Sequence, residues 1–598
     1  MAGLQADKDI LAGLAEAARD EVELDKKKIE STTSHEHELD GIHDGLEFPT
    51  EQERSTLRRV SDQIPWSAYL IAICELSERF SYYGTTVVFT NFIQQPLPAG
   101  SKTGANVKQA GALGLGQRAS TGIGTFNTFW VYVIPLFGAY IADTRWGRFK
   151  TICVAVAVAL FGHVLLIISS VPGVIEHSHG SLACFIIAII VMGLGTGGFK
   201  ANVSPLVAEQ YKRSKPFIGH TKQGERVIVD PAMTTSRIYM YFYLFINVGS
   251  LIGQISMAYS EKYVGFWLAY TLPTVVFMIC PFVLYFGRNM YVRSPPQGSV
   301  LSKSIRIWRT AARGRFTWNP VQTWRNLNAA DFWESAKPSN WKGESRPSWM
   351  TFDDEWVDEV KRGFKACSVF LWFPIYWLTY NQLNNNLTSQ AATMVTNGVP
   401  NDVLSNLDPF ALIIFIPIVD QFVYPALRRW GINFSPLKRI TLGFFTGAAA
   451  MVYTAVVQHY IYKHNPCGYQ VATCTDPVTH EPLTSDLNVW IQTPSYVLIA
   501  FSEIFASITG LEYAFTKAPK NMRSLVMSVF LFASAVAAAL GEAFVSLSSD
   551  PLLVWNYAVM GVLAFFAGCI FWFQYRELDA QEDELNLLNE GHYDEKKH

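Results

Sequence analysis

The chain has 598 residues, of which 50% are hydrophobic, 14% are aromatic and only 16% are charged. Its formal net charge of −2 gives no electrostatic reason to bind nucleic acid, and its positive mean hydropathy of +0.15 sets it apart from ordinary soluble enzymes. The charged residues gather at the two ends, so residues 1–64 and 577–598 are predicted to be solvated tails. No apolar segment follows Met1, and the first export signal is expected near Pro65.

Apolar stretches of about 20 residues recur along the chain and predict transmembrane helices. Twelve are expected, at 65–93, 121–142, 150–172, 181–207, 236–258, 264–288, 363–384, 408–427, 438–462, 488–514, 522–547 and 552–575. A long polar segment separates the sixth helix from the seventh. We therefore predict an all-α membrane protein with two six-helix bundles, 65–290 and 363–576, joined by a cytoplasmic linker at 291–362.

The positions of lysine and arginine predict the orientation. If the N-terminus is inside, the short inner connections carry Arg145, Arg148, Lys150, Arg428, Arg429, Lys438, Arg439, Lys517, Lys520 and Arg523. The outer connections carry only Lys102, Lys108, Arg118, Lys262 and Lys463. The positive-inside rule then places both tails in the cytoplasm, and the plasma membrane is the expected location.

Two features of the predicted outer connections bear on covalent modification. Cys467 and Cys474 lie in the connection before the tenth helix, where a disulfide is chemically permitted and two free thiols remain an alternative. Asn386-Leu-Thr388 is a glycosylation sequon after the seventh helix, so Asn386 is a possible glycosylation site. No cluster of histidine and cysteine suggests a metal, and no cofactor is expected.

Charges inside the predicted spans are the main clue to function. The segment ELSERFSYYG (75–84) places Glu75, Glu78, Arg79 and Tyr82 on one face of a helix. Each charge at a bilayer centre costs about 2.5–3.5 kcal/mol on insertion scales, so this face should point into the protein or a watery cavity. A purely structural ion pair between helices is the alternative.

Three further charges lie in or near other spans. Lys200 follows the glycines of GLGTGG in the fourth span, where helices can approach closely and the ammonium can reach a central cavity. Glu503 lies inside the tenth span, and Asp408 lies at the start of the eighth. Each side chain could instead extend to the membrane interface, an alternative that is strongest for Asp408.

Four segments in order resemble one known family. ELSERFSYYG matches the ExxERF-YYG signature of the proton-dependent oligopeptide transporters, a branch of the major facilitator superfamily. GAYIADTRWGRFKTI (138–152) resembles the connection between their second and third helices, FYLFINVGSL (242–251) their fifth helix, and GLEYAFTKAPKNMRS (510–524) the exit of their tenth. The matches cover about residues 66–575, and the layout of linker, outer loop and tails is similar to that of fungal peptide permeases.

The resemblance implies a symporter that imports di- and tripeptides with protons by alternating access. Glu503 would hold the peptide ammonium, and Lys200 and Arg79 would face its carboxylate. Glu75 and Glu78, beside the same cations, would take part in proton coupling, because each carboxylate loses a counter-ion when a peptide binds. The expected partners are peptides, protons and the lipid bilayer, and a monomer is expected.

The same resemblance assigns further side chains to the substrate cavity. Asn247 would bond the peptide backbone, and Tyr82, Tyr83, Tyr132 and Trp377 would form amphipathic walls, although ordinary packing is the alternative for each tyrosine. Asn381 and Asp408 are also expected to bind the substrate. Asp143 and Arg148 belong to the expected gating loop.

Two positions depart from the family pattern. Many bacterial relatives have an ion pair where this chain has Thr86 and Asn381, so another contact must close the gate. Asp408 stands where relatives often have asparagine, which adds an acid that could bind an amino group or a proton.

Other functions remain possible on the sequence alone. Nitrate or another small solute could be carried on the same scaffold, although Glu503 argues against an inorganic anion. A peptide-sensing receptor without transport is a second alternative. An enzyme is not expected, because no nucleophile–base pair or phosphate-binding loop is evident.

Overall fold

The computed structural model describes residues 46–585, with gaps at 214–215, 222–223, 294–299, 328, 330, 342–346, 348, 384, 431, 433, 479–481 and 517–522. The tails predicted at 1–64 and 577–598 therefore lie largely outside the described residues. So do Lys517 and Lys520 of one predicted inner connection.

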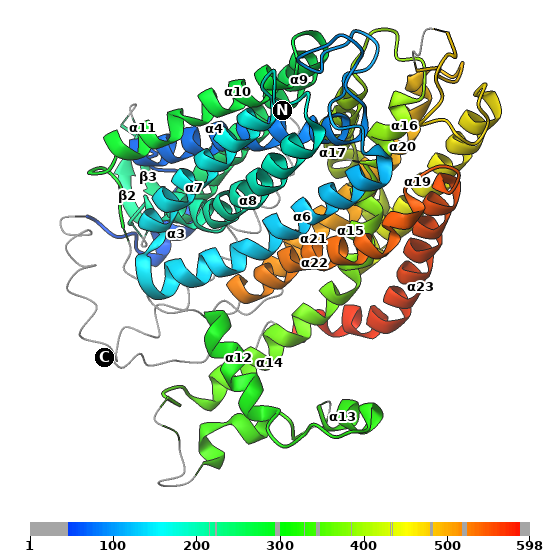
Figure 1. The fold of residues 1–598 in the computed structure, drawn as a ribbon. Coiled ribbons are helices and arrows are strands. Elements are labelled where there is room, and N and C mark those ends of the chain that lie inside the picture. Colours follow the sequence, from blue (N-terminus) through cyan, green and yellow to red (C-terminus); the bar gives the residue numbers. More distant parts are fainter. Residues whose placement is uncertain are drawn as a thin grey trace.

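The first half of the chain forms one group of long helices (Figure 1). Its helices are α4 (Trp66–Val87) with α5 (Phe89–Gln94), α6 (Gly116–Ile141) with the π-helical turn η1 (Ala142–Trp146), α7 (Arg148–Ser170), α8 (Ser178–Glu209), α9 (Pro231–Tyr263), and α10 (Phe266–Phe277) with α11 (Ile279–Phe286). Their cores consist mainly of aliphatic and aromatic side chains from α4, α5 and α7 to α11, and side chains of α6 pack against one of these cores.

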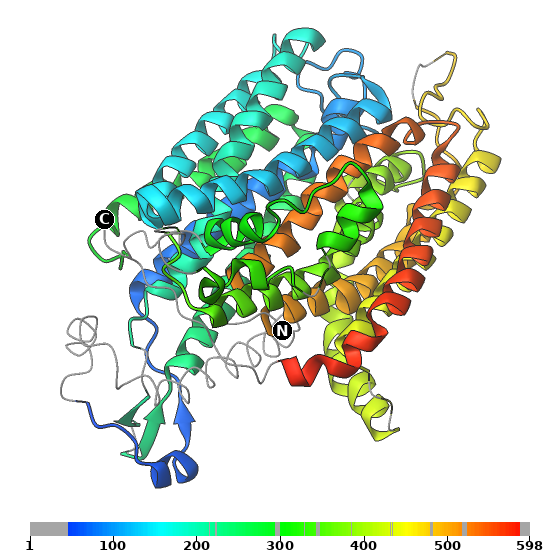
Figure 2. The same cartoon turned by 90° about the horizontal axis from the view of Figure 1, so that it is seen from below.

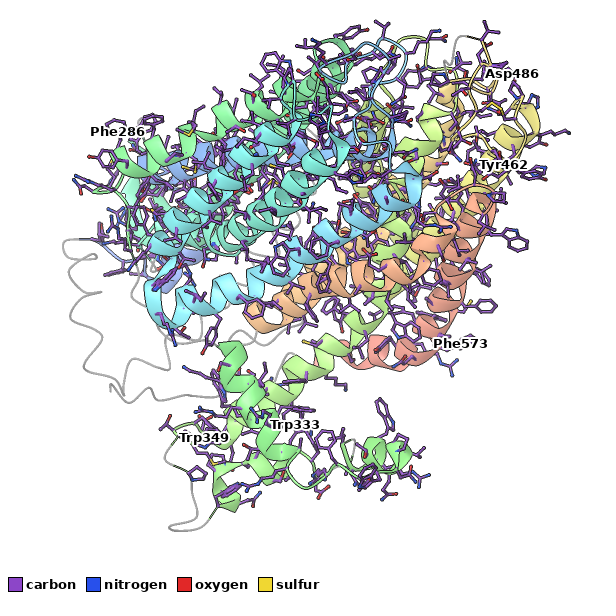
Figure 3. All side chains as sticks on the ribbon, in the orientation of Figure 1. Phe286, Trp333, Trp349, Tyr462, Asp486 and Phe573 are labelled. Carbon is purple, nitrogen blue, oxygen red and sulfur yellow. A yellow bond between two sulfur atoms is a disulfide. The ribbon has the colours of Figure 1, made fainter. Side chains whose placement is uncertain are left out.

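The second half forms the other group, and several of its helices are broken. They are η5 (Val369–Trp372), α15 (Phe373–Tyr380), η6 (Asn381–Leu383), α16 (Asn386–Ala392), η7 (Asn401–Asn406), α17 (Leu407–Ile418), η8 (Val419–Val423), α18 (Tyr424–Arg429), α19 (Pro436–His464), η9 (Val489–Gln492), α20 (Thr493–Ser502), η10 (Glu503–Ile508), α21 (Thr509–Thr516), α22 (Arg523–Phe544), η12 (Val545–Leu547) and α23 (Leu553–Leu585). Phe286 and Phe573, both highly exposed, extend from the two groups toward the surroundings (Figure 3).

Among the described residues, ten helices are long and apolar enough to cross a membrane. The predicted first and seventh spans are not among them. The first, α4, carries Glu75, Glu78 and Arg79 in its middle. The seventh is divided into the short helices η5, α15, η6 and α16. A multi-pass membrane protein is thus established, and the full number of twelve stays a prediction.

Glycine lets the helices of the first half pack backbone against backbone. A Cβ atom at Gly249 of α9 would lie 2.5 Å from the Leu76 carbonyl oxygen of α4, and one at Gly253 would meet the Phe80 carbonyl oxygen. No other residue fits at such a distance. The helix that carries the ELSERF charges is thereby held directly against α9.

A small sheet lies at one end of the first half, which the prediction of an all-α chain did not include (Figure 2). Strand β3 (Arg226–Val229) pairs in parallel with β1 (Arg59–Val60) and antiparallel with β2 (Phe217–His220). The segment before α4 is therefore tied to the connection between α8 and α9. The apolar run from Val227 to Val229 is buried, which explains why this polar-looking loop folds.

The segment predicted as a linker forms a folded lobe. It contains α12 (Val300–Ala311), α13 (Pro320–Leu327) and α14 (Asp354–Ser368), of which the last crosses the boundary predicted at 362. The lobe lies below the two groups of helices and contacts α22 (Figures 1 and 2). Its side chains, including those labelled Trp333 and Trp349 in Figure 3, surround a core of their own.

An ion pair within this lobe joins the segment after α12 to the segment after α13. Arg315 donates to both carboxylate oxygens of Asp331, at 3.2 and 3.0 Å. These hydrogen bonds lower the pKa of Asp331.

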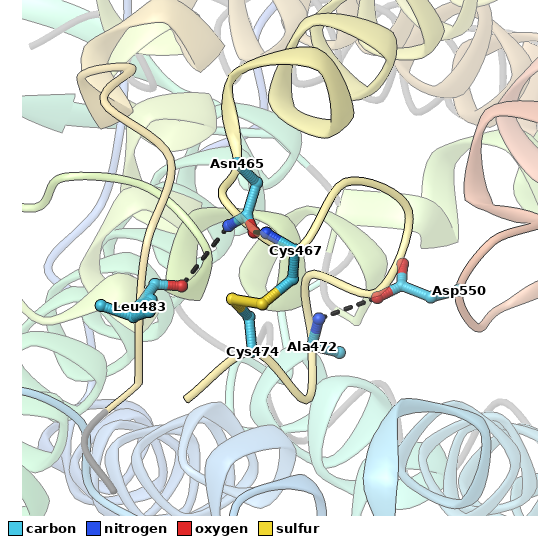
Figure 4. Close-up of a disulfide and its surroundings, with 6 residues drawn as sticks. All are labelled: Asn465, Cys467, Ala472, Cys474, Leu483 and Asp550. Atoms are coloured by element: carbon cyan, nitrogen blue, oxygen red, sulfur yellow. Dashed lines mark hydrogen bonds between the residues drawn. A yellow bond between two sulfur atoms is a disulfide. The ribbon is translucent and has the colours of Figure 1, made fainter. Parts of the chain in front are cut away.

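A disulfide joins Cys467 to Cys474 in the long connection after α19 (Figure 4). The Ala472 amide donates to Asp550 Oδ2 at 2.8 Å, which fixes the loop to the segment before α23. Within the loop, Asn465 Nδ2 donates to the Leu483 carbonyl oxygen at 3.4 Å. The structure thereby resolves the choice between paired and free thiols in favour of the pair.

Two glycines of α8 test the importance of close helix packing. A Cβ atom at Gly195 would lie 2.6 Å from the Ala155 carbonyl oxygen and from the Ala159 Cα atom of α7, whereas Gly180 has no atom within 4 Å of that position. We expect Gly195→Ala to lower the melting temperature of the purified protein, because overpacking costs about 1–3 kcal/mol. Gly180→Ala, the matched control, should melt no lower than the unchanged protein. Equal melting temperatures for both variants would contradict this packing.

Candidate functional site

The charges of ELSERFSYYG form a compact buried cluster on α4. Arg79 Nε lies 2.7 Å from Glu75 Oε1 and 3.0 Å from Glu78 Oε2. The three side chains are only 2–4% exposed. One guanidinium therefore neutralises two carboxylates incompletely, and a second cation is needed for balance.

Lys200 of α8 supplies that cation. Its ammonium lies 4.1 Å from the centre of the Tyr132 ring on α6. Its charge interacts with the charges of Glu78, Glu75 and Arg79, which we call its electrostatic neighbours. Two acids and two bases thus meet between α4 and α8, and this half of the site has no net charge.

The corresponding site in the second half is acidic. Tyr380 of α15 donates its hydroxyl to Asp408 Oδ2 at 3.4 Å, and both side chains are hydrogen-bond partners of Glu503. Glu503 opens the π-helical turn η10, an irregularity that is frequent at functional sites. Among the described residues, no lysine or arginine is an electrostatic neighbour of either acid. When both acids are ionised, no described cation balances the negative charge of this half of the site.

Tyr132 lies between the two sets of charges. Arg79 of the first half and Glu503 of the second are both its electrostatic neighbours. Arg79 and Glu503, a base and an acid from opposite halves, thus both lie near the Tyr132 side chain. A short dipolar ligand could contact both sets.

The other predicted cavity residues, and Thr86, occupy less decisive positions. The Trp377 ring packs edge-on against Tyr376 and Tyr380, and Tyr82 packs against Tyr83. Asn247 is exposed on α9. Asn381 is half-buried in η6. Thr86 donates its hydroxyl to the Tyr83 carbonyl oxygen at 3.4 Å, within its own helix.

The predicted gating loop links three helices of the first half. Arg148, the first residue of α7, lies 3.8 Å from Asp143 Oδ1 and also pairs with Glu209 at the end of α8. Gly147, between η1 and α7, has a φ of 73°, a conformation that favours glycine. The loop therefore acts as a fixed connection between α6, α7 and α8.

Sequence reasoning missed a network of amides and hydroxyls that joins the two halves. Gln117 Nε2 and the Thr121 hydroxyl of α6 donate to Asn386 Oδ1 at 3.1 and 3.2 Å, and Ser389 donates to Gln94 Oε1 at 2.5 Å. The run NQLNNNLTSQ (381–390) could have indicated it, because so many amides in a membrane helix require partners.

This network corrects the prediction of a possible glycosylation site at Asn386. The side chain is 1% exposed, and its amide nitrogen donates to Gln382 Oε1 at 2.6 Å and to the Ser548 hydroxyl at 3.3 Å. A sugar on this nitrogen has no room in the structure. The sequon is therefore part of a buried contact between the halves.

The comparisons with known proteins agree with this architecture. The family model described as "PTR2: POT family" matches residues 149–560. Peptide transporter PTR_B of Candidozyma auris is 43% identical over 575 residues, which cover 96% of this chain and 93% of that protein. The probable peptide transporter ptr2 of Schizosaccharomyces pombe is 44% identical over 544 residues, which cover 90% of this chain and 82% of that protein.

Solved structures show the same fold. The crystal structure of the POT family transporter PepTSo matches with a TM-score of 0.67 at 20% identity, and covers 87% of this chain and 99% of its own. The fold, the breadth of the matches and the identity to the fungal proteins lead to one conclusion: the chain belongs to the POT family. The prediction that it is not an enzyme is confirmed, because its family and relatives are transporters.

The corrected role of Asn386 has a direct test. We expect the protein produced in yeast to keep its electrophoretic mobility after treatment with an endoglycosidase, because Asn386 is enclosed between the halves. Asn386→Gln is the control. A sugar that is lost in Asn386→Gln would contradict the buried position.

Proposed function

We propose that the chain is a proton-coupled symporter that imports di- and tripeptides. In this proposal twelve helices form two six-helix bundles, 65–290 and 363–576, which alternately expose a central site to the two sides of the plasma membrane. The observation that carries the proposal is the division of charge, with Arg79 and Lys200 in the first half and Glu503 and Asp408 in the second.

A zwitterionic peptide complements this division. Its ammonium would face Glu503 and Asp408, where the described residues supply no cation. Its carboxylate would face Lys200 and Arg79. Because only a short dipolar ligand meets both sets of charges at once, binding favours the state in which the halves are closed. The names of the fungal relatives, peptide transporters, support this ligand.

Proton coupling follows from competition for two cations. Glu75 and Glu78 share Arg79, whose Nε lies closer to Glu75 Oε1, at 2.7 Å, than to Glu78 Oε2, at 3.0 Å. When a peptide carboxylate takes Arg79 or Lys200 as its partner, Glu78 loses attraction to a counter-ion and gains a reason to bind a proton. Release of this proton to the cytoplasm would restore the ion pair and expel the peptide.

The disulfide supports an orientation with both termini in the cytoplasm. Disulfides persist on the extracellular side and are rare in the cytosol. Cys467 and Cys474 are joined in the connection between α19 and α20, which the distribution of lysine and arginine predicts to be outside.

Transport of another small solute is the second candidate function. Nitrate, as an inorganic anion, has no ammonium to satisfy Glu503 and Asp408. A receptor without transport would have no need of a titratable cluster in α4. The experiment that tests the proposal is uptake of labelled dipeptide into liposomes with and without a proton gradient, and uptake independent of the gradient would contradict it.

Replacing Glu78 tests the proton relay. We expect Glu78→Gln to abolish gradient-driven accumulation of dipeptide and to leave peptide exchange between the two sides at least partly intact, because only a titratable group is lost. Both are measured in the same liposomes. If Glu78→Gln still accumulates peptide, the relay lies at Glu75 or Asp408.

The two ends of the peptide can be tested separately. We expect Glu503→Gln to weaken binding of free dipeptides by about one to two orders of magnitude, because pairing a charge is worth about 1.5–3 kcal/mol. N-acetylated dipeptides should be affected little. Lys200→Ala should show the converse, with C-terminal amides spared. The measurement is competition against a labelled dipeptide, and equal losses for all three ligands would mean that these charges only hold the helices together.

A further inference from the structure

A second group of buried acids, outside the predicted cavity residues, lies where the two halves meet. Glu261 near the end of α9 is 1% exposed, and Asp402 in η7 is 0% exposed. The side-chain nitrogen of Asn91 in α5 lies 2.7 Å from Glu261 Oε1 and 3.0 Å from Asp402 Oδ2. Carboxylate oxygens from opposite halves therefore share one nitrogen.

The hydrogen-bond donors at this point are too few. Asn91 Nδ2 also lies 2.9 Å from Asn401 Oδ1, and Asn401 Nδ2 is engaged with Asn91 Oδ1 at 3.0 Å and the Thr388 carbonyl oxygen at 3.1 Å. An amide nitrogen has two hydrogens, and that of Asn91 faces three acceptors. A proton on one of the two carboxyl groups supplies the missing donor.

The balance of charge at this point also requires one proton. Among the described residues, Lys262 is the cation that faces both acids, and its ammonium donates to the Val399 carbonyl oxygen at 3.3 Å. The other titratable groups that face the pair are Tyr270 of α10 and Tyr496 of α20, which are uncharged phenols at ordinary pH. Two carboxylates and one ammonium leave one buried negative charge, which a single proton neutralises.

We propose that Glu261 and Asp402 form a proton-binding site that holds one proton between them while the outer ends of the two halves are in contact. Separation of the halves moves Glu261 away from Asp402 and hydrates both, so each can ionise. The closed form therefore binds one proton more than the open form, and a lower external pH favours closure. The inference rests on the proposed function for two points, which side is outside and that the halves separate there in one state.

This proton differs from the one proposed at Glu78. It enters and leaves on the outer side, because the pair is hydrated only when that side opens. It is therefore not carried across the membrane with the peptide. External acidity would act through it on the closing step and leave the ratio of protons to peptide unchanged.

The separation of the outer ends can be measured directly as a function of pH. Spin labels on p-acetylphenylalanine at Val107 and Thr473, exposed positions in outer loops of the two halves, avoid the native cysteines. The measurement is made in nanodiscs between about pH 5 and about pH 8. We expect the population with the long, open distance to rise with pH relative to the population with the short, closed distance, by up to about tenfold per pH unit for a one-proton transition. Glu261→Gln and Asp402→Asn should each reduce this rise to less than about twofold.

The controls separate a proton site from a merely structural contact. Glu176→Gln, which removes an exposed outer carboxyl group, should keep the full response to pH. Asp402→Asn should still accumulate dipeptide against its gradient, unlike Glu78→Gln. An unchanged pH response in Glu261→Gln and Asp402→Asn, or no response in the unchanged protein, would overturn the proposal. Loss of accumulation in Asp402→Asn would overturn the conclusion that this proton stays outside.

Discussion

The cost of holding charge away from water is the constraint on which the rest of this structure depends. Arg79, Glu75 and Glu78 are all nearly inaccessible in the middle of α4, and a charge left unpaired there would destabilise the fold strongly. Lys200 must therefore come close, and the glycines of α8 and α9 let these helices approach their neighbours. The packing of the first half is thus arranged around a balanced set of charges.

The second half does not have that balance. Glu503 and Asp408 lie around Tyr380 without a described cation, so this half has its lowest free energy when a ligand or a proton supplies positive charge. The π-helical turn at Glu503 interrupts regular packing at the same point. A family member with this asymmetry is suited to a ligand that carries its positive charge at one end.

The sequence predicted the elements whose signals are local, and it missed those that depend on distant partners. Apolar runs located the long helices, and the spacing of Glu75, Glu78 and Arg79 correctly placed them on one face of α4. The pairing of β1 with β3 joins residues about 170 positions apart, which no local pattern reveals. Asn386 was misread for the same reason, because its sequon is local and its partners Gln117 and Thr121 lie in another helix.

Several contacts between the two halves are polar, and this affects how readily the halves separate. Amides and hydroxyls such as Gln94, Asn386 and Ser389 form bonds that water can replace, so each contributes only about 0.5–1.5 kcal/mol to closure. An apolar interface of the same size would hold the halves together far more strongly, because separation would expose its surface to water. Polar contacts fix the register of the closed form and cost less to separate than an apolar interface would. A modest input, such as one proton at a shared carboxyl pair or one peptide in the centre, is then enough to shift the population.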